Sequence, residues 1–415
     1  MEKRRIVITG MGTVNPLGKS VGDTWAAVLE GKSAIVKITR FDASNITCRV
    51  AGEIKEFDYK EYFDEEYIKL AKRMDLFTHY SGAATKEALA QSGLDCSAEP
   101  HRIGICIGSG IGGILTQHNN SAALINKGPR RVSPFYIPTT IGNIASGFLS
   151  IIHGITGPNL SVQTACATAN HSLGIGSMLI EKGMADVMIT GGAEASISEI
   201  SMAGFSNMRA LSTRNDDPAT ASRPYDKDRD GFVMGEGGCT LILEEYEHAK
   251  KRGANIICEV LSVGMSGDAH DLVIPEPNGA GAFASMEMAV NYAGINSSEI
   301  DYINAHGTAT PLGDIAESKA IYKLLKGNQE NVNVGSTKSM HGHLLGATAG
   351  LEAIITAMSI KNNTVPANIN IFTRDPEVVL NDSINTEIIE KEVKIGLSNS
   401  FGFGGHNSTL ILRKI

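Results

Sequence analysis

The sequence lacks three features that would each point to a particular class of protein. Its six cysteines form no C-x-x-C pair, which argues against a structural zinc site and against a disulfide framework. Its formal net charge is −8, so nothing drives non-specific binding to nucleic acid. No apolar run approaches the roughly 18 residues that a membrane span requires. We therefore expect reduced thiols, a cytoplasmic location, no nucleic-acid partner and no membrane span.

The start of the chain also lacks the core of a secretion signal. The apolar run after "MEKRR" is broken within about seven residues by Thr, Gly and Asn, which is too short for such a core. With 415 residues, 45 of them glycine, the composition is instead typical of a glycine-rich α/β enzyme with two domains or one large duplicated domain.

Strands and helices are predicted to alternate along the chain. The first set of strands is predicted at 4–10, 102–113, 159–165 and 185–192, with helices at 20–32, 141–154 and 166–183. A polar, turn-rich segment, 214–231, is expected to be a long loop, functional or flexible. The pattern then restarts, with strands expected in 231–253 and at 256–268, 300–310 and 332–339, and helices at 314–327 and 346–362. Such alternation implies an α/β fold whose mainly parallel sheet is covered on both faces.

The restart of the pattern predicts an internal duplication. We expect an N-terminal half over residues 1–253, carrying Cys166, and a C-terminal half over 254–415, carrying His306 and His343. If the halves pack as pseudo-symmetric partners, the turns with Cys166 and His343 face each other at the carboxyl ends of their strands.

Three segments carry the candidate chemistry. Cys166 lies in "TACATA", His306 in "NAHGTATPLGD" and His343 in "TKSMHGHLLGATAGLEA", and each follows a predicted strand. A cysteine at the start of a helix feels the positive end of the macrodipole, which favours the thiolate. Histidines brought close to such a cysteine would complete an activated nucleophile.

Each of these residues also has a simpler explanation. Cys166 alone would usually be an inert buried thiol, and His306 could merely hydrogen-bond within a turn. His341 and His343 form an H-x-H pair that could ligate a metal, but the segment offers no other ligand except Glu352. The three strand-to-turn placements together favour catalysis, with no metal.

The quoted segments, together with "NSFGFGGHN", resemble the active-site segments of the thiolase-fold condensing enzymes, and among them the β-ketoacyl-[acyl-carrier-protein] synthase II group of bacterial type II fatty-acid synthesis. The resemblance runs in order from "IVITGMGTVNPLG" to "GFGGHNSTLIL" and covers essentially the whole chain. It implies a thiolase-like five-layered α-β-α-β-α fold built from two pseudo-symmetric halves, and a homodimer. The Cys-His-His set resembles that of elongating enzymes, since initiating enzymes carry Cys-His-Asn and thiolases have a second cysteine near the position of Gly404.

The resemblance also implies a mechanism. Cys166 would take an acyl chain from an acyl carrier protein, and His306 and His343 would donate hydrogen bonds to the malonyl thioester as carbon dioxide leaves. The product would be a 3-oxoacyl carrier protein two carbons longer. No cofactor is implied beyond the phosphopantetheine of the carrier.

Further residues match the family by position. Lys338 and Glu352 would order the site as a buried pair, although two exposed charges are the simpler explanation. The backbone N–H groups of Cys166 and Phe403 would form an oxyanion hole, and Phe403 would gate the acyl pocket rather than only fill the core. Ile111 would line the far end of the acyl pocket and distinguish type II from type I synthases, and Thr308 and Thr310 would bind the pantetheine arm. The chain departs from the commonest pattern at His406, where many relatives have Thr.

An acidic carrier protein would require a local basic patch on this acidic chain. Candidate docking residues come from three segments, although charge runs are usually only solvated faces: Lys69, Lys72 and Arg73; Lys127, Arg130 and Arg131; and Arg209.

Four alternatives remain open from the sequence. A type I synthase and a polyketide ketosynthase share the fold and the triad. A non-catalytic chain-length partner typically lacks the nucleophile, which is present here as Cys166. A cysteine hydrolase would use one histidine with an Asn or Asp, and the second histidine argues against it.

Overall fold

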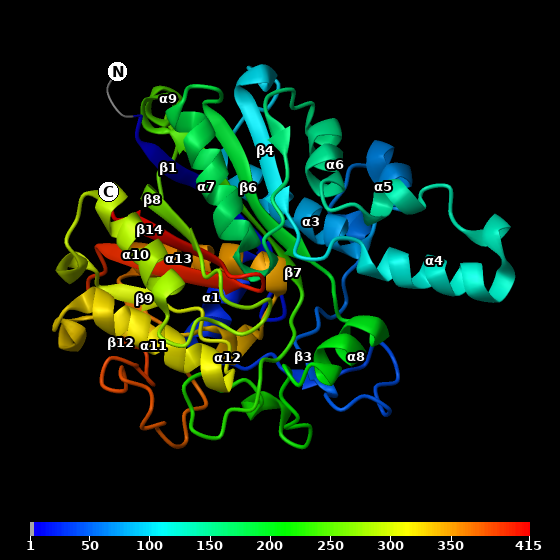
Figure 1. Ribbon diagram of the computed structural model, residues 1–415. Coiled ribbons are helices and arrows are strands. Elements are labelled where there is room, and N and C mark those ends of the chain that lie inside the picture. Colours follow the sequence, from blue (N-terminus) through cyan, green and yellow to red (C-terminus); the bar gives the residue numbers. More distant parts are fainter. Residues whose placement is uncertain (1–3) are drawn as a thin grey trace.

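The computed structural model describes residues 4–415 and is organised around one large mixed sheet (Figure 1). Its ten strands lie in the order β10-β9-β13-β14-β8-β1-β7-β6-β4-β5. Along the chain they are β1 (Ile6–Val14), β4 (Ile103–Gly108), β5 (Asn159–Leu160), β6 (Val187–Glu194), β7 (Gly237–Glu245), β8 (Cys258–Gly267), β9 (Tyr302–Asn304), β10 (Asn333–Gly335), β13 (Ile395–Gly402) and β14 (His406–Arg413). Two small ribbons pair β2 (Val36–Lys37) with β3 (Val50–Ala51) and β11 (Thr364–Val365) with β12 (Ile389–Glu390).

The sheet consists of two halves with the same strand order. The first half has the spatial order β5-β4-β6-β7-β1 and the second β10-β9-β13-β14-β8. If the five strands of each half are numbered along the chain, both halves have the same spatial order: third, second, fourth, fifth, first. The halves join where Ile6–Ile8 of β1 pairs with Cys258–Val260 of β8. This repeat agrees with the expected duplication, whereas a division of the chain at residue 253 stays a prediction.

The expectation of a mainly parallel sheet is wrong. β4 pairs in parallel with β5 and β6, and β9 with β10 and β13, but the strands from β6 through β1 and β8 to β13 pair antiparallel. β13 and β14 are joined by residues 403–405, a connection too short for a parallel crossover. Buried apolar runs therefore identified the strands but not their directions.

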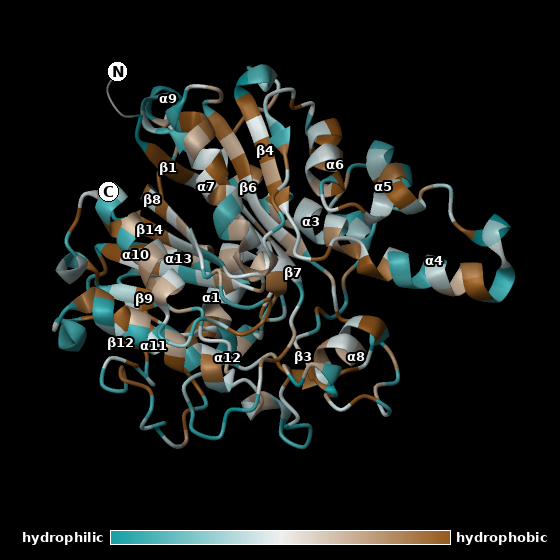
Figure 2. Cartoon of the chain, in the orientation of Figure 1, coloured by the Kyte–Doolittle hydropathy of each residue, from teal (hydrophilic) through white to brown (hydrophobic). Residues whose placement is uncertain are grey.

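Helices form three layers around the two half-sheets, which confirms the expected five-layered arrangement. The central helices are α7 (Thr168–Glu181) and α13 (Thr348–Asn362), and both pack against strands of both halves. The outer helices are α3 (Leu76–Ser92) and α6 (Ile144–His153) over the first half, and α10 (Ala280–Ala293) and α11 (Pro311–Leu325) over the second. Because α13 has 12 of its 15 residues buried, it is a helix enclosed on all sides, and Figure 2 shows the apolar strands around it.

The remaining helices are shorter or peripheral, and α4 projects from the body at the right of Figure 1. The predicted helix at 20–32 corresponds to α1, whose N-terminus is capped by the Ser20 hydroxyl accepting from the Asp23 N–H at 3.0 Å. These helices are α1 (Val21–Leu29), α2 (Ile68–Ala71), α4 (Ile114–Lys127), α5 (Tyr136–Thr140), α8 (Glu199–Asn207), α9 (Tyr246–Lys251) and α12 (Lys338–His341).

Two predicted strands have different lengths in the structure. β1 continues to Val14 although its sequence contains Gly10 and Gly12, because α3 crosses the strand so closely that a Cβ at Gly12 would lie 2.0 Å from the Ala84 carbonyl. The strand expected at 159–165 pairs only over Asn159–Leu160, and the chain then leaves the sheet edge toward Cys166.

The long polar segment 214–231 contains only one short 3₁₀ helix, Pro218–Thr220, and is fixed by buried charges. Arg229 lies 2.6 Å from Asp375 and 3.4 Å from Asp314. The Asp226 carboxylate accepts the N–H groups of Phe372 and Thr373 at 2.7 and 2.8 Å. The loop is therefore an ordered part of the second half's core.

Among residues 4–415, no helix combines the length and the apolar character that crossing a membrane demands.

Candidate active site

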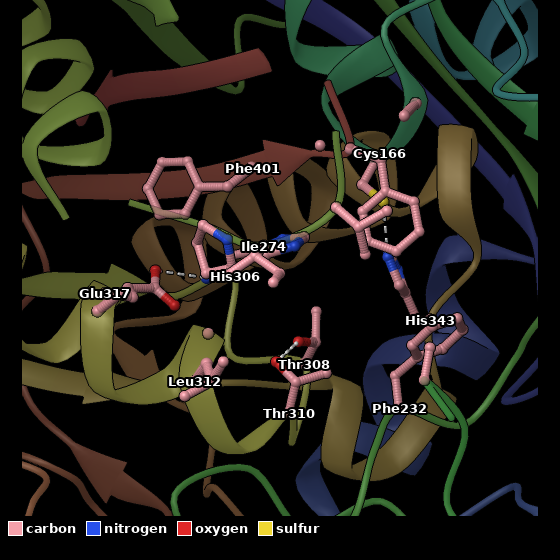
Figure 3. Close-up of a pocket in the computed structure, with 18 of the residues that line it drawn as sticks. Cys166, Phe232, Ile274, His306, Thr308, Thr310, Leu312, Glu317, His343 and Phe401 are labelled. Atoms are coloured by element: carbon pink, nitrogen blue, oxygen red, sulfur yellow. Dashed lines mark hydrogen bonds between the residues drawn. The ribbon is translucent and has the colours of Figure 1, made fainter. Parts of the chain in front are cut away.

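The three predicted residues meet in a large cavity. The cavity has a volume of about 560 Å³, and Cys166, His306 and His343 all line it. The Cys166 Sγ and one nitrogen of each histidine lie within 4.8 Å of one another. In Figure 3 the thiol points at His343, and the His306 ring lies beside them. Segments some 140 to 180 residues apart thus meet where the two halves face each other, as expected.

Cys166 sits in the turn that opens α7. It is the middle residue of a 3₁₀ turn, Ala165–Ala167, and its side chain is buried. The turn is fixed from the second half, because the Ser400 hydroxyl donates to the Cys166 carbonyl at 2.7 Å. The thiol therefore lies at the N-terminus of a central helix, as the sequence predicted.

The helix N-terminus does not by itself make Cys166 a thiolate. Burial raises the pKa of the Cys166 thiol to about 12, against the opposing effects of the Lys338 charge and of the backbone N–H groups of Phe403 and Cys166. The expected bias toward thiolate is thus outweighed, and the resting side chain is a neutral thiol.

We predict that alkylation of Cys166 by iodoacetamide accelerates about tenfold per pH unit from pH 7 to pH 9.5 without a plateau, because the thiolate fraction keeps rising below the pKa. The measurement is peptide mass spectrometry of the Cys166 peptide over time. A free small-molecule thiol, whose rate levels off near its own pKa of about 8.5, is the control. A rate for Cys166 that is flat above pH 7 would mean that a thiolate is already present.

His343 is held in place by four contacts. Its backbone N–H donates to the Val233 carbonyl at 2.7 Å, and its Nδ1 lies 2.8 Å from the Thr348 hydroxyl. Its Nε2 lies 2.9 Å from Cys166 Sγ, and the Phe232 ring packs edge-on against the imidazole at 5.3 Å. Burial, with the Lys338 charge and His341 nearby, holds the pKa of His343 well below its usual range, so the ring is neutral.

His306 is fixed through its backbone by Glu317 of α11. The Glu317 carboxylate accepts the N–H of His306 at 2.8 Å and that of Gly307 at 2.7 Å. Burial, then the Lys338 charge and His343, hold the pKa of His306 well below its usual range. Sequence reasoning missed Glu317, although a signal exists: on the predicted helix it lies on the same face as the apolar Ile321 and Leu324, where an acidic residue needs a partner.

Lys338 and Glu352 form the expected buried pair. Their charged groups are 2.5 Å apart, and the side chains are 1% and 0% exposed. Burial raises the pKa of Glu352 to about 7, whereas the Lys338 charge lowers it. The alternative of two exposed surface charges is therefore wrong.

The residues expected to contact substrate all line the cavity. The hydroxyls of Thr308 and Thr310 lie 3.0 Å apart (Figure 3). The Phe403 ring centroid is 6.3 Å from that of Phe205, and Ile111 borders the cavity from the first half. Which part of a substrate each of them contacts stays a prediction.

The seven basic candidates are all exposed, but only Arg209 borders the cavity. Arg209 adopts a left-handed backbone conformation, with φ of 57°. The guanidinium of Arg73 stacks over the Phe135 ring at 4.3 Å. The structure thus places Arg209 at the cavity and leaves the other six at the surface.

The H-x-H pair does not converge on a metal position. His341 turns away from His343: its Nδ1 lies 2.6 Å from the Gly342 carbonyl and its Nε2 3.0 Å from the Thr337 hydroxyl. Glu352 pairs with Lys338 instead. The set whose spacing would suit a soft cation is the one described above, Cys166 with His306 and His343.

Comparison with known proteins agrees with this geometry. Residues 3–249 match the family model for the beta-ketoacyl synthase N-terminal domain, and residues 257–372 match that for the C-terminal domain. The 3-oxoacyl-[acyl-carrier-protein] synthase 2 of Vibrio cholerae is 48% identical over 419 residues, covering 100% of both chains. The protein of the same name from Staphylococcus aureus is 46% identical over 414 residues, covering 100% of this chain and 99% of its own.

Solved ketosynthase structures share the fold. A beta-ketoacyl synthase from Burkholderia phymatum superposes with a TM-score of 0.92 at 31% identity, over 99% of this chain and 100% of its own. The ishigamide ketosynthase/chain length factor gives a TM-score of 0.91 at 31% identity over 100% of both chains. These neighbours confirm the thiolase-like fold. A chain matched by both domain models and aligned from end to end with such relatives belongs to the beta-ketoacyl synthase family.

Proposed function

We propose that the protein catalyses the decarboxylative Claisen condensation of malonyl carrier protein with an acyl chain held on Cys166, the two-carbon elongation step of type II fatty-acid synthesis. The observation that carries the proposal is the meeting of one buried thiol and two imidazoles within 4.8 Å in a cavity of about 560 Å³. The 48% identity to a 3-oxoacyl-[acyl-carrier-protein] synthase 2 over the whole chain supports this reaction over polyketide synthesis, since the ketosynthase/chain length factor neighbour is 31% identical.

In the first half-reaction Cys166 Sγ attacks the thioester carbonyl of acyl carrier protein. A carbon–sulfur bond forms to Cys166, the bond to the carrier sulfur breaks, and the thiol proton ends on the carrier thiol. The nearest nitrogen to receive that proton in passing is His343 Nε2, 2.9 Å from Sγ. The backbone N–H groups of Cys166 and Phe403, which point toward the sulfur, would stabilise the oxyanion of the tetrahedral intermediate.

In the second half-reaction the two imidazoles act as donors. As the malonyl group loses carbon dioxide, negative charge moves to its thioester oxygen, and N–H groups of His306 and His343 would stabilise that enolate. Neutral rings suit this role, since a neutral imidazole can donate from one nitrogen, and the Thr348 hydroxyl can accept or donate at the other nitrogen of His343. The enolate carbon then attacks the acyl group, and Cys166 leaves as thiolate and takes up a proton.

The test is intact-protein mass spectrometry of wild type and Cys166→Ala. After exposure to long-chain acyl carrier protein, only wild type should gain one acyl mass, and a chase with malonyl carrier protein should convert it to a 3-oxoacyl carrier protein two carbons longer. Release of free fatty acid despite the malonyl chase would instead support the hydrolase alternative. No acylation with any chain length would support a non-catalytic partner.

We also infer that an acidic acyl carrier protein docks on the exposed basic residues. A type II polyketide ketosynthase in complex with its acyl carrier protein has the same fold at a TM-score of 0.90 and 28% identity, which supports docking of a carrier protein on this fold. The docking residues would be Lys69, Lys72, Arg73, Lys127, Arg130, Arg131 and Arg209.

Reversal of charge at Lys69, Lys72 and Arg73 to Glu is expected to raise the KM for carrier-bound substrates about tenfold at low salt, with little change for small-molecule thioesters, because only the carrier uses this patch. Steady-state kinetics with both substrate types measures the difference. The control is the same reversal at Lys250 and Lys251 of α9, which lie outside the three candidate segments. An equal rise for both substrate types would contradict docking here.

Three further features belong to the proposal. The protein would need no cofactor, because the thiol and the malonyl carboxylate supply the chemistry. Retention of full activity after dialysis against a chelator tests this.

The protein would be a homodimer. Exposed Ile137 and Ile151, on α5 and α6 next to the sheet edge, support this, and light scattering would measure the mass of the assembly. It would be cytoplasmic, in keeping with six free cysteines, as cell fractionation would show.

A further inference from the structure

One buried carboxylate at the site has no part in the mechanism above. Glu194 is the last residue of β6, and its side chain is 0% exposed. It accepts five hydrogen bonds within residues 4–415, all from neutral hydroxyl or backbone N–H groups. Oε2 accepts from the N–H of Gly110 at 2.8 Å and of Gly346 at 3.1 Å; Oε1 accepts from Ser109 Oγ at 3.1 Å, Ser196 Oγ at 3.1 Å and the Ile111 N–H at 3.3 Å.

These bonds tie together two turns that border the cavity. Gly110 and Ile111 line it from the first half. Gly346 belongs to the second half, three residues after His343 and two before Thr348, whose hydroxyl contacts the His343 ring. The turns approach so closely that a Cβ at Gly110 would lie 2.6 Å from Glu194 Oε2. Glu194 thus links the turn at Gly110 and Ile111, on the proposed acyl pocket, to the segment that carries His343 and Gly346.

The duplication explains why a carboxylate lies at this point. β6 and β13 are both eight residues long and hold the same place in their half-sheets, so Glu194 corresponds to Gly402, the last residue of β13. The turns before α7 and α13, Ala165–Ala167 and Leu345–Ala347, likewise correspond, which pairs Cys166 with Gly346.

Independent details support this correspondence. The residues that open the two turns, Ala165 and Leu345, both have a φ of 48°. Two positions before the end of each strand, Ser400 donates to the Cys166 carbonyl, and a Cβ at Gly192 would lie 2.4 Å from the Gly346 carbonyl.

Gly402 and Glu194, the two equivalent strand ends, differ in what they place beside the N–H groups of Cys166 and Gly346. A Cβ at Gly402 would lie 3.1 Å from the Cys166 nitrogen, so the absence of a side chain at Gly402 leaves room beside that N–H. At the equivalent position the Glu194 carboxylate, from the first half, accepts the corresponding N–H, that of Gly346 in the second half. Burial raises the pKa of Glu194 to about 7, opposed by the N–H groups of Gly346 and Gly110 and by the Ser196 and Ser109 hydroxyls.

We propose that Glu194 is a positioning residue whose carboxyl group fills the counterpart of the oxyanion hole in the duplicated fold and so holds the His343 segment against the acyl-pocket turn at Gly110 and Ile111. The inference rests on the proposed condensing function. On this proposal the two equivalent sites of the duplicated fold differ in function. The site at the Cys166 N–H binds the substrate oxyanion, and the site at the Gly346 N–H is filled by Glu194.

The test is chemical rescue of Glu194→Ala by formate, a small carboxylate that fits the vacated position. Single-turnover acylation and condensation are measured for wild type, Glu194→Ala and Glu244→Ala, in formate and in chloride of equal ionic strength. The Glu194 variant is expected to condense about 100-fold more slowly than wild type, because the histidine segment is no longer held in register. Formate should restore at least about tenfold of this loss, since it supplies the missing acceptor for the N–H groups.

Glu244→Ala is the matched control. Glu244 is equally buried and well bonded, but it lies at the other end of the same strand pair: Glu194 is opposite Gly237, and Val187 is opposite Glu244. Seven residues of strand, about 23 Å, separate the two ends. This control should lose thermal stability yet condense normally, without a response to formate.

The outcomes separate the two proposals. If wild type does not condense, the proposed function fails. If wild type condenses and Glu194→Ala matches it, or is slow but insensitive to formate, the positioning role is overturned.

If Glu194→Ala does not fold, Glu194→Gln decides. With its amide oxygen toward Gly110 and Gly346, this variant loses only the Ile111 bond, and its ratio of long-chain to short-chain acylation should fall about fivefold, the equivalent of one hydrogen bond. An unchanged ratio would overturn the proposal.

Discussion

His343→Ala is expected to form the acyl-enzyme at Cys166 but to condense it with malonyl carrier protein at least about 100-fold more slowly than wild type. Removal of one preorganised donor from an enolate costs about two to three orders of magnitude in rate, because no water can replace it in a buried site. The same loss is expected for His306→Ala, whose ring lies 5.4 Å from that of His343. Rapid-quench mass spectrometry of the two half-reactions measures it.

The control for these variants is His248→Ala on α9, whose imidazole contacts Glu244 at 2.6 Å at the outer end of the strand pair. It should condense at the wild-type rate. Should His343→Ala lose acylation and condensation to the same extent, His343 would serve mainly as the base for Cys166, and the donor role would be wrong.

Lys338→Met is expected to lower the free energy of unfolding by about 3–5 kcal/mol, the usual cost of removing one member of a fully buried ion pair. The reason is that Glu352, 0% exposed, would lose the only cation bonded to it within residues 4–415. Denaturant unfolding followed by fluorescence measures the change. The double variant Lys338→Met/Glu352→Leu should recover most of the stability, since it leaves no unpaired charge.

The same double variant separates stability from chemistry. The Lys338 charge opposes the burial effect on the Cys166 pKa, so the double variant should remain slower than wild type in acylation even where it is fully folded. A single variant that loses less than about 1 kcal/mol would mean that the pair is not desolvated as the structure indicates.

The reactive residues could be found from the sequence because each follows a predicted strand and has small residues around it. Cys166, His306 and His343 are all in short segments whose strand-turn-helix pattern is local, so the prediction did not depend on the rest of the chain. The pairing of the two turns across the halves followed from the repeat. The sequence did not show which residue of the second turn is equivalent to Cys166. In the structure it is Gly346, not His343.

The residues that hold the site could not be found in the same way. Glu317 acts from α11 on a backbone 10 and 11 positions away, and Glu194 acts on Gly346 across 152 positions. Such partners are set by tertiary packing, and an isolated glutamate in a sequence carries no sign of what it will bond. The same limit applies to the strand directions, since a buried apolar run is the same in a parallel and an antiparallel neighbour.

The enclosed position of α7 and α13 has a consequence for how such a protein can be taken apart. Each helix lies between both half-sheets, so a fragment that contains only one half would leave one face of its own central helix without a partner. Exchange of whole halves between two relatives would therefore need matched packing on both faces of both central helices. A point substitution at the cavity, by contrast, changes one side chain and leaves most of this packing in place, which makes it the easier route by which an enzyme of this architecture acquires a new acyl-chain preference.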